Sequence, residues 1–170
     1  MAPSILITYA TKHGSTRQVA EAIAETLDEQ GFGVHVESAV DLHDLSTFDG
    51  VVLGTALYMG RPHADARRFL KRYHKALSAI PVAVFAMGPM TTGPDDIAGS
   101  KKQLDRALAT VSDIIPISTA IFGGVVDPAK LHFPFSRMEA SDARDWDIIA
   151  AWARELAAAF GARELVRSAR

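Results

Sequence analysis

The 170-residue chain contains no cysteine. This absence excludes disulfide bonds, thiol nucleophiles, zinc sites with cysteine ligands and iron–sulfur clusters, and it fits a reducing compartment. Long apolar runs are also missing, since no stretch approaches the roughly 20 residues that span a bilayer. No charged and then apolar leader precedes the first apolar segment. We therefore expect a cytoplasmic protein without a transmembrane segment.

An excess of charge of either sign is lacking too. The chain has 18 Lys and Arg against 20 Asp and Glu, a formal net charge of −2. This balance gives no support to a nucleic-acid partner. The six histidines lack the spacing of metal ligands, so no metal site is expected. With 48% apolar residues, residues 1–170 are predicted to form one globular domain.

The most informative stretch runs from Ile5 to Arg17. Ile5–Ile7 is a continuous apolar run, which is typical of a central parallel strand covered on both faces. From Thr16 onward, apolar residues recur at helical spacing. The turn between them holds hydroxyls, cations and Gly14. A helix N-terminus carries unpaired N–H groups and a positive partial charge, so this turn is a candidate phosphate loop. An ordinary capped turn is the alternative.

Strands and helices alternate along the rest of the chain. Strands are predicted at Phe32–Glu37, Gly50–Gly54, Val82–Ala86 and Ile114–Phe122. Helices are predicted at Leu42–Phe48, His63–Ile80 and Ile97–Val111, and a last helix runs from Asp142 to Gly161. The tail after Gly161 is expected to be frayed. Pro116 places the last strand at the sheet edge. Residues 123–140 are expected to be irregular. This alternation predicts an α/β, doubly wound sheet.

Three unusual loops each follow the carboxyl end of a predicted strand: Thr11–Thr16, Thr55–Arg61 and Met87–Gly93. In doubly wound sheets, ligands bind beyond these strand ends, so the loops should converge on one rim. The first loop is neither G-x-G-x-x-G nor G-x-x-x-x-G-K-[ST], which disfavours a Rossmann or P-loop site. One phosphate held by hydroxyls and backbone, with two loops to flank a flat ring, suits a mononucleotide such as FMN.

The stretch Tyr9–Thr16 resembles the phosphate loop of the flavodoxin family, aromatic-x-[ST]-x-[ST]-G-x-[ST]. The pattern is matched at Tyr9, Thr11, Gly14 and Thr16. It departs at His13, where a hydroxyl is usual, and at Ser15, where asparagine is common. Lys12 and Arg17 make the loop more basic than is usual. The resemblance covers roughly residues 4 to 160 and implies a five-stranded parallel sheet of order 2-1-3-4-5, in three layers, with FMN as cofactor.

The resemblance also implies which residues contact FMN. These are Thr11, Lys12, His13, Gly14, Ser15, Thr16, Thr55, Ala56, Leu57, Tyr58, Met59, Gly60, Met87, Gly88, Pro89 and Thr91. Tyr58 is the candidate for stacking on the flavin ring, and a half-exposed surface tyrosine is the alternative. Met59-Gly60 resembles the turn beside flavin N5, where glycine permits a positive φ. No residue is required as acid or base, because the flavin supplies the redox chemistry.

Arg61 stands where many carriers have an acid. We hypothesise that it removes a repulsion against the anionic reduced flavin, which would ease the second reduction step. An exposed arginine pointing into water is the alternative interpretation.

Carrier flavodoxins are typically acidic because they steer toward basic partners, whereas this chain is nearly neutral. It looks more like the flavodoxin-like protoporphyrinogen dehydrogenases of heme biosynthesis, which pass electrons from protoporphyrinogen IX through FMN to a quinone such as menaquinone. The matching features are Thr11–Arg17, the loop from Gly54 to Gly60 with the basic helix after it, and Asp145-Trp146.

Members of that family carry a long basic and aromatic insert before the last helix, and the equivalent segment here, Gly124–Ser141, is shorter. It is interpreted as a flap that admits a flat hydrophobic substrate or a quinone, or else as an extension of the edge strand. Two functions stay open: a quinone-linked FMN dehydrogenase, and a non-catalytic FMN carrier serving a redox partner protein. Peripheral membrane contact also stays open.

Overall fold

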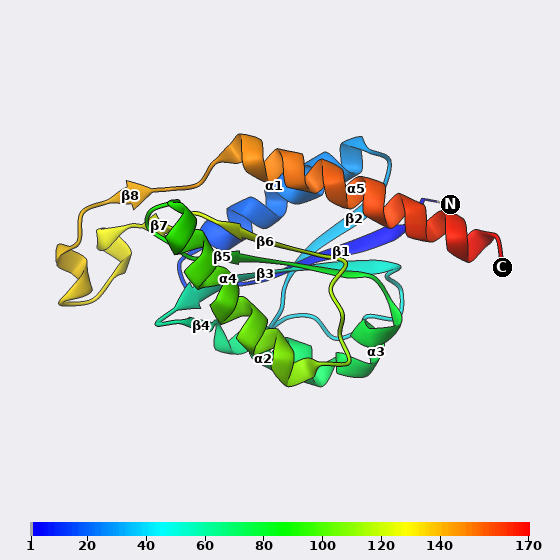
Figure 1. Cartoon of the computed structure of the whole chain (residues 1–170), viewed down its shortest axis with the longest axis horizontal. Coiled ribbons are helices and arrows are strands. Elements are labelled where there is room, and N and C mark those ends of the chain that lie inside the picture. The colour runs from blue at the N-terminus through cyan, green and yellow to red at the C-terminus, as the bar shows by residue number, and fades with distance from the viewer. Residues whose placement is uncertain (1) are drawn as a thin grey trace.

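A computed structural model describes residues 2–170 (Figure 1). The strands are β1 (Ser4–Ala10), β2 (Gly33–Ser38), β3 (Gly50–Tyr58), β4 (Arg61–Pro62), β5 (Val82–Met87), β6 (Ser118–Phe122), β7 (Val125–Val126) and β8 (Ser141–Asp142), and the α-helices are α1 (Ser15–Glu29), α2 (Ala64–Arg72), α3 (His74–Ala79), α4 (Pro94–Leu108) and α5 (Trp146–Ser168). Short 3₁₀ turns lie at Ala109–Val111, Pro128–Lys130 and Phe135–Arg137.

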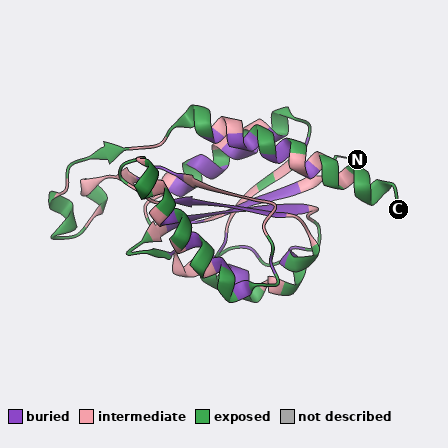
Figure 2. Cartoon of the chain, viewed as in Figure 1, coloured by how far each residue is buried: buried purple, intermediate pink, exposed green. Residues whose placement is uncertain are grey.

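The main sheet has the order β2-β1-β3-β5-β6, and all four pairings along it are parallel. Helices α1 and α5 cover one face, and α2, α3 and α4 cover the other, so the central strands are buried between two apolar layers (Figure 2). The predicted three-layer, flavodoxin-like fold and strand order are therefore confirmed. β2 and β6 lie at the edges, as predicted. β6 begins at Ser118, after Pro116, so the predicted strand from Ile114 started too early.

β3 is longer than its apolar run indicated. Most of the predicted loop Thr55–Arg61 is strand: β3 continues to Tyr58, and β4 returns antiparallel beside it, off the main path of the sheet. Met59 and Gly60 form the turn between them, with φ of 50° and 79°. The resemblance placed a turn at Met59-Gly60 with glycine at positive φ, and this turn is present. A turn of two residues with positive φ matches the twist of a hairpin, and the sequence prediction missed that the residues on either side of it pair as strands.

The helix predicted over His63–Ile80 is divided into α2 and α3. Tyr73 lies between them with φ −105°, and its hydroxyl donates to the backbone carbonyl of Leu42 at 2.9 Å. This contact joins residues 31 positions apart. The apolar periodicity continues through the break, so the local sequence pattern gave no sign of it.

The predicted short helix at Leu42–Phe48 is wrong, because this segment is a loop. The Asp44 carboxylate accepts hydrogen bonds from the Ser46 backbone N–H at 2.9 Å and from the Ser46 hydroxyl at 2.7 Å. Such local bonds between side chain and backbone compete with a helix. Leu42 and Leu45 are nevertheless buried, which explains the amphipathic pattern.

The last helix begins and ends later than predicted. Its N-cap is Asp145, not Asp142, and the Asp145 carboxylate accepts from two backbone N–H groups of the first turn. The helix continues past Gly161 to Ser168, so the predicted frayed tail is wrong. Arg167 holds this end against the body through a 2.8 Å ion pair with Asp49.

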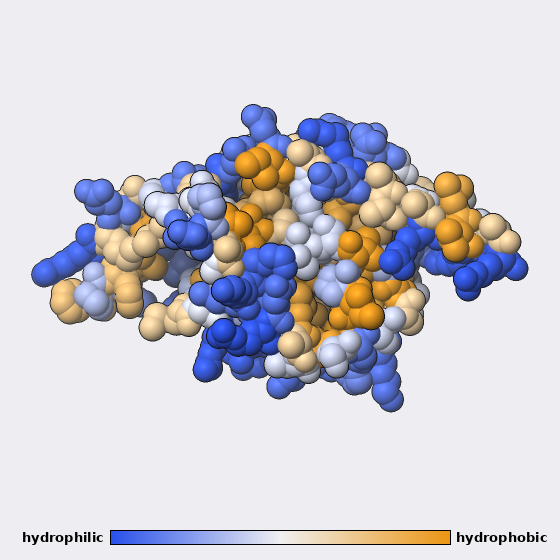
Figure 3. Space-filling view, viewed as in Figure 1, coloured by the Kyte–Doolittle hydropathy of each residue, from blue (hydrophilic) through white to orange (hydrophobic). Residues whose placement is uncertain are grey.

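Residues 124–144, here called the arm, project from the body at the end of the sheet that holds the loops (Figure 1). β7 and β8 pair antiparallel at its base, so the predicted irregular segment contains a small hairpin. Its base lies against the third loop, since the Gly124 N–H donates to the Pro89 carbonyl at 2.8 Å. In the space-filling view, the arm shows both hydrophilic and moderately hydrophobic atoms, whereas α4 presents mainly hydrophilic ones (Figure 3).

None of the helices within residues 2–170 combines the length and the apolar character that crossing a bilayer needs.

The course of α5 through Gly161 predicts the effect of a substitution. A Cβ at this position meets nothing within 4 Å, so Gly161→Ala should stabilise the protein by about 0.5–1 kcal/mol through helix propensity. The measurement is urea unfolding followed by circular dichroism. A neutral or destabilising Gly161→Ala would mean that the helix ends earlier.

Gly54→Ala is the opposite case, because a Cβ there would collide with the Phe85 ring. This substitution should destabilise the protein by about 1–3 kcal/mol in the same measurement.

Candidate functional site

The three loops and the arm enclose a cavity of about 680 Å³ at the carboxyl ends of β1, β3 and β5. This volume lies in the range of small-molecule sites. The cavity is lined by Lys12, His13, Ser15, Ala56, Leu57, Tyr58, Met59, Arg61, Pro62, His63, Ala64, Arg67, Met87, Gly88, Gly124, Val125, Val126, Leu131, Phe135 and Met138. The expectation that three loops distant in sequence converge on one rim is met.

Most of the predicted site residues line this rim. Lys12, His13, Ser15, Ala56, Leu57, Tyr58, Met59, Met87 and Gly88 line the large cavity, and Gly14 lines a smaller one beside it. The remaining candidates line neither cavity: Thr11, Pro89 and Thr91 lie in the loops that form the walls, Gly60 lies in the turn between β3 and β4, Thr16 lies in the first turn of α1, and Thr55 lies in β3. Whether any of these residues contacts FMN stays a prediction.

Several of the wall residues hold the loops in place. The Thr11 hydroxyl accepts from the Gly14 N–H at 3.1 Å, which closes the first loop. The buried Thr55 hydroxyl accepts from the His63 N–H at 3.0 Å, which fixes the start of α2 to β3. In the third loop, Thr91 donates to the Asp96 carboxylate. These contacts position the rim without needing a ligand.

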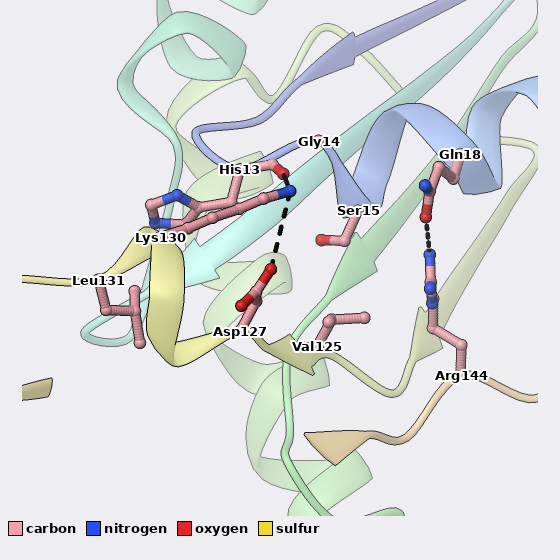
Figure 4. Close-up of a pocket in the computed structure, with 9 residues that line it drawn as sticks. All are labelled: His13, Gly14, Ser15, Gln18, Val125, Asp127, Lys130, Leu131 and Arg144. Carbon is pink, nitrogen blue, oxygen red and sulfur yellow. Dashed lines mark hydrogen bonds and ion pairs between the residues drawn. The ribbon is translucent and has the colours of Figure 1, made fainter. Parts of the chain in front are cut away.

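The smaller cavity, about 280 Å³, lies at the N-terminus of α1 and shares His13, Ser15, Val125 and Leu131 with the larger one (Figure 4). An elongated ligand with an anionic end could therefore extend through both. Gly14 takes the N-cap position with φ 92°, in the left-handed region that glycine tolerates.

The N-terminus of α1 leaves hydrogen-bonding groups available for such an anion. Within residues 2–170, no side chain caps this helix, so its first N–H groups are free. The Thr16 hydroxyl is fully buried in the first turn, and no partner for it exists in the described part of the chain. Buried hydroxyls are normally hydrogen-bonded, and a phosphate oxygen would satisfy these groups. The residues present therefore fit the phosphate of FMN.

The larger cavity has mainly apolar walls that suit a flat ring. Tyr58 is 36% exposed, and its ring makes edge contacts with the rings of His13 and His63, at centroid distances of 6.3 and 6.0 Å. Burial raises the pKa of the Tyr58 hydroxyl, so it stays neutral. Burial also lowers the pKa of His13, with Lys12 and Lys130 adding to the effect, so the imidazole is neutral near pH 7.

Sequence reasoning missed the contribution of the arm's base to the smaller cavity. Arg144 donates to the Gln18 side chain at 2.6 Å, across 126 positions of sequence, and Asp127 lines the same cavity. His63 and Arg67 of α2 were also not assigned to the site. His63 could have been found, because a residue just before a helix often caps it, and its side chain does accept from the Asp65 N–H.

Comparison with known proteins identifies the family. Residues 6–138 match the family described as "Flavodoxin domain". The chain belongs to the flavodoxin-domain family. Because the match covers the phosphate loop, the hairpin and most of the arm, membership makes FMN the cofactor of this chain.

Characterised relatives are similar over most of the chain. Protoporphyrinogen IX dehydrogenase [quinone] of Escherichia coli K12 is 24% identical, in a match that covers 89% of this chain and 93% of that protein. The Leishmania major protein of the same name is 27% identical over 77% of this chain and 58% of its own length.

Solved structures of low sequence identity share the fold. A single-residue mutant of flavodoxin from Pseudomonas aeruginosa has a TM-score of 0.61 and 17% identity, and the match covers 93% of this chain and 99% of that one. Rubredoxin oxygen:oxidoreductase of Desulfovibrio gigas has a TM-score of 0.64 and 15% identity, over 95% of this chain and 37% of that one.

The position of Tyr58 at the mouth of the cavity yields a test of ring stacking. Tyr58→Ala should weaken FMN binding by about tenfold, because aromatic stacking and its apolar contact area are lost. Tyr58→Phe keeps the ring and should stay within about twofold of the wild type. The measurement is quenching of FMN fluorescence on titration into apoprotein. Equal FMN affinities for the wild type and Tyr58→Ala would mean that Tyr58 is a half-exposed surface residue that does not stack on the flavin.

Proposed function

We propose that the chain is an FMN-dependent oxidoreductase that takes electrons from a flat, reduced, apolar donor of the porphyrinogen class and gives them to a quinone. The observation that carries this proposal is the arm, whose Leu131, Phe135 and Met138 form one wall of the cavity that Tyr58 and Met59 also line. Apolar walls from both the arm and the hairpin suit a flat hydrophobic molecule better than a polar protein surface.

Cations beside the cavity support a donor that carries carboxylates. Lys12, Arg61 and Arg67 line the same cavity as the apolar walls. Arg67 is held in place, since its Nε donates to the Pro62 carbonyl at 3.3 Å. A porphyrinogen has an apolar macrocycle with propionate side chains, and arginine pairs well with carboxylates.

The proposed reaction balances without a catalytic acid or base from the chain. In each turnover, one electron pair and two protons leave the donor, which gains one double bond, and one quinone takes them up to become a quinol. Full oxidation of a porphyrinogen to a porphyrin removes six electrons, so it takes three such turnovers and three quinones. Bound FMN supplies the redox chemistry between the two. The residues of this chain bind and orient: the first loop holds the phosphate, and the hairpin and arm hold the flat molecules and exclude water.

A non-catalytic FMN carrier is the second candidate. The arm is shorter than the family insert, and the fold is shared with flavodoxins at 13–19% identity. The apolar Met59, Met90 and Phe133 are 93%, 54% and 72% exposed and could contact a redox partner protein or a membrane surface. The cytoplasmic location and the single domain over residues 1–170 stay predictions.

Anaerobic reduction tests the proposed reaction. Protoporphyrinogen added to the FMN-loaded protein should bleach the visible absorbance of the flavin, and menaquinone should restore it. Phe135→Ala should slow the bleaching by protoporphyrinogen, because Phe135 lines the cavity, while reduction by dithionite stays unchanged. Phe133→Ala is the matched control, because Phe133 is exposed and lines neither cavity.

The outcomes separate the two candidate functions. If protoporphyrinogen leaves the flavin oxidised while a flavodoxin reductase still reduces it, the protein is a carrier. A protein that takes up no FMN would contradict both functions.

Arg61 gives a test of how the chain tunes its cofactor. It pairs with Tyr58 across the hairpin and lines the cavity. Arg61→Asp should shift the potential of the second reduction step to more negative values, on the order of tens of millivolts, because an acid repels the anionic reduced flavin. The measurement is a spectroelectrochemical titration. Lys71→Asp, with the same charge change on the exposed face of α2, controls for net charge. Identical potentials for Arg61→Asp and wild type would overturn the hypothesis.

A further inference from the structure

The arm reaches back to the first loop through Lys130. Its Nζ donates to the backbone carbonyl of His13 at 3.1 Å, a contact that joins residues 117 positions apart. This places an arm-borne ammonium at the smaller cavity, beside Gly14 and Ser15 at the start of α1. In Figure 4, the Lys130 ammonium and the Ser15 hydroxyl point toward the same space.

The second cation of this cavity, Arg144, already has hydrogen-bond partners within the protein. Its guanidinium makes two hydrogen bonds to Asp142, at 3.0 and 2.7 Å, and a third to Gln18 at 2.6 Å, and it lies over the Trp146 ring at 4.8 Å. The side chain is only 10% exposed. Arg144 therefore fastens the base of the arm to α1, and its charge is largely neutralised by Asp142.

Lys130 has donors left for a ligand. An ammonium has three donors, and the contact with His13 uses one. The carboxylate of Asp127 is 4.0 Å away, beyond hydrogen-bonding distance, and its other oxygen accepts from the Ala129 N–H. Asp127 is an acid facing the same space, so Lys130 also offsets a carboxylate that would otherwise repel an anion there.

We propose that Lys130 is a phosphate-binding residue for FMN, supplied by the arm to the backbone and hydroxyl donors of the first loop. The inference rests on FMN binding at this rim and adds to it a ligand from outside the loop. It has two consequences. First, the protein binds FMN more tightly than riboflavin, by a larger factor than the donors of the first loop alone would give. Second, the bound phosphate holds the arm against the site.

The test compares FMN with riboflavin. Lys130→Gln removes the ammonium and should weaken FMN binding on the order of tenfold, as expected for one charge-assisted hydrogen bond. Riboflavin affinity should stay unchanged, because riboflavin has no phosphate. Lys130→Arg should retain most of the FMN affinity. The loss in Lys130→Gln should shrink at high salt, since a partly exposed charge is screened. Affinities are measured by fluorescence titration of apoprotein.

Hydrogen–deuterium exchange provides a readout that does not depend on affinity. FMN should slow exchange of the arm's backbone amides in the wild type, whereas riboflavin should not, and FMN should lose this effect in Lys130→Gln. Lys75→Gln on the exposed face of α3 removes the same charge, lines neither cavity and should behave as wild type.

Two results would overturn the inference. If Lys130→Gln weakens the binding of FMN and of riboflavin equally, Lys130 only holds the arm in place. If Lys130→Gln leaves the FMN affinity unchanged, Lys130 does not contact the phosphate. Either result leaves the proposed reaction standing, because protoporphyrinogen reduction of the flavin is measured separately.

Discussion

The site depends on one constraint: parallel strands of one sheet end at the same edge. β1, β3 and β5 are buried on both faces, and their apolar side chains leave no room for polar ligands along their length. Apart from single buried threonines such as Thr8, polar side chains gather where the strands stop. The N-terminus of α1 lies at that edge because Gly14 turns the chain in a left-handed conformation shortly after β1. Backbone donors, a buried hydroxyl and a largely apolar cavity thus meet at one place.

The sheet could be predicted because its signals are local. Apolar runs such as Ile5–Ile7 and Val82–Ala86 mark buried strands, and their alternation with helical periods fixes the layers. Helix ends were predicted less well, because distant contacts decide them. Tyr73 bonds to the Leu42 carbonyl where the helical pattern continues, and the contact of Arg167 with Asp49 supports a helix that Gly161 would otherwise have weakened.

The residues of the site also fall into two groups, those marked by local sequence signals and those placed by distant contacts. The loop residues follow strands directly, so Lys12–Ser15 and Tyr58, which line the cavities, could be named from the sequence. The other wall could only be suggested as a flap, because Lys130 and Arg144 meet the first loop and α1 across 117 and 126 residues. No local pattern marks such pairs. The turn at Met59-Gly60 could be named from the resemblance, but Met59 at a positive φ gave no sign that the flanking residues pair as a two-residue hairpin.

The arm also bears on the choice between a carrier and an enzyme. The sheet and first loop are common to proteins of both kinds, so the fold cannot decide the reaction. A carrier must expose its flavin edge to a protein surface, whereas an enzyme must enclose a small molecule beside it. In this chain the arm walls part of the cavity, and the rim is cationic although the whole chain carries a net charge of −2. Charge concentrated at the mouth of a cavity attracts an anionic ligand to that point, while an acidic carrier spreads its charge over a docking face. Both features favour a small acidic donor over a basic protein partner.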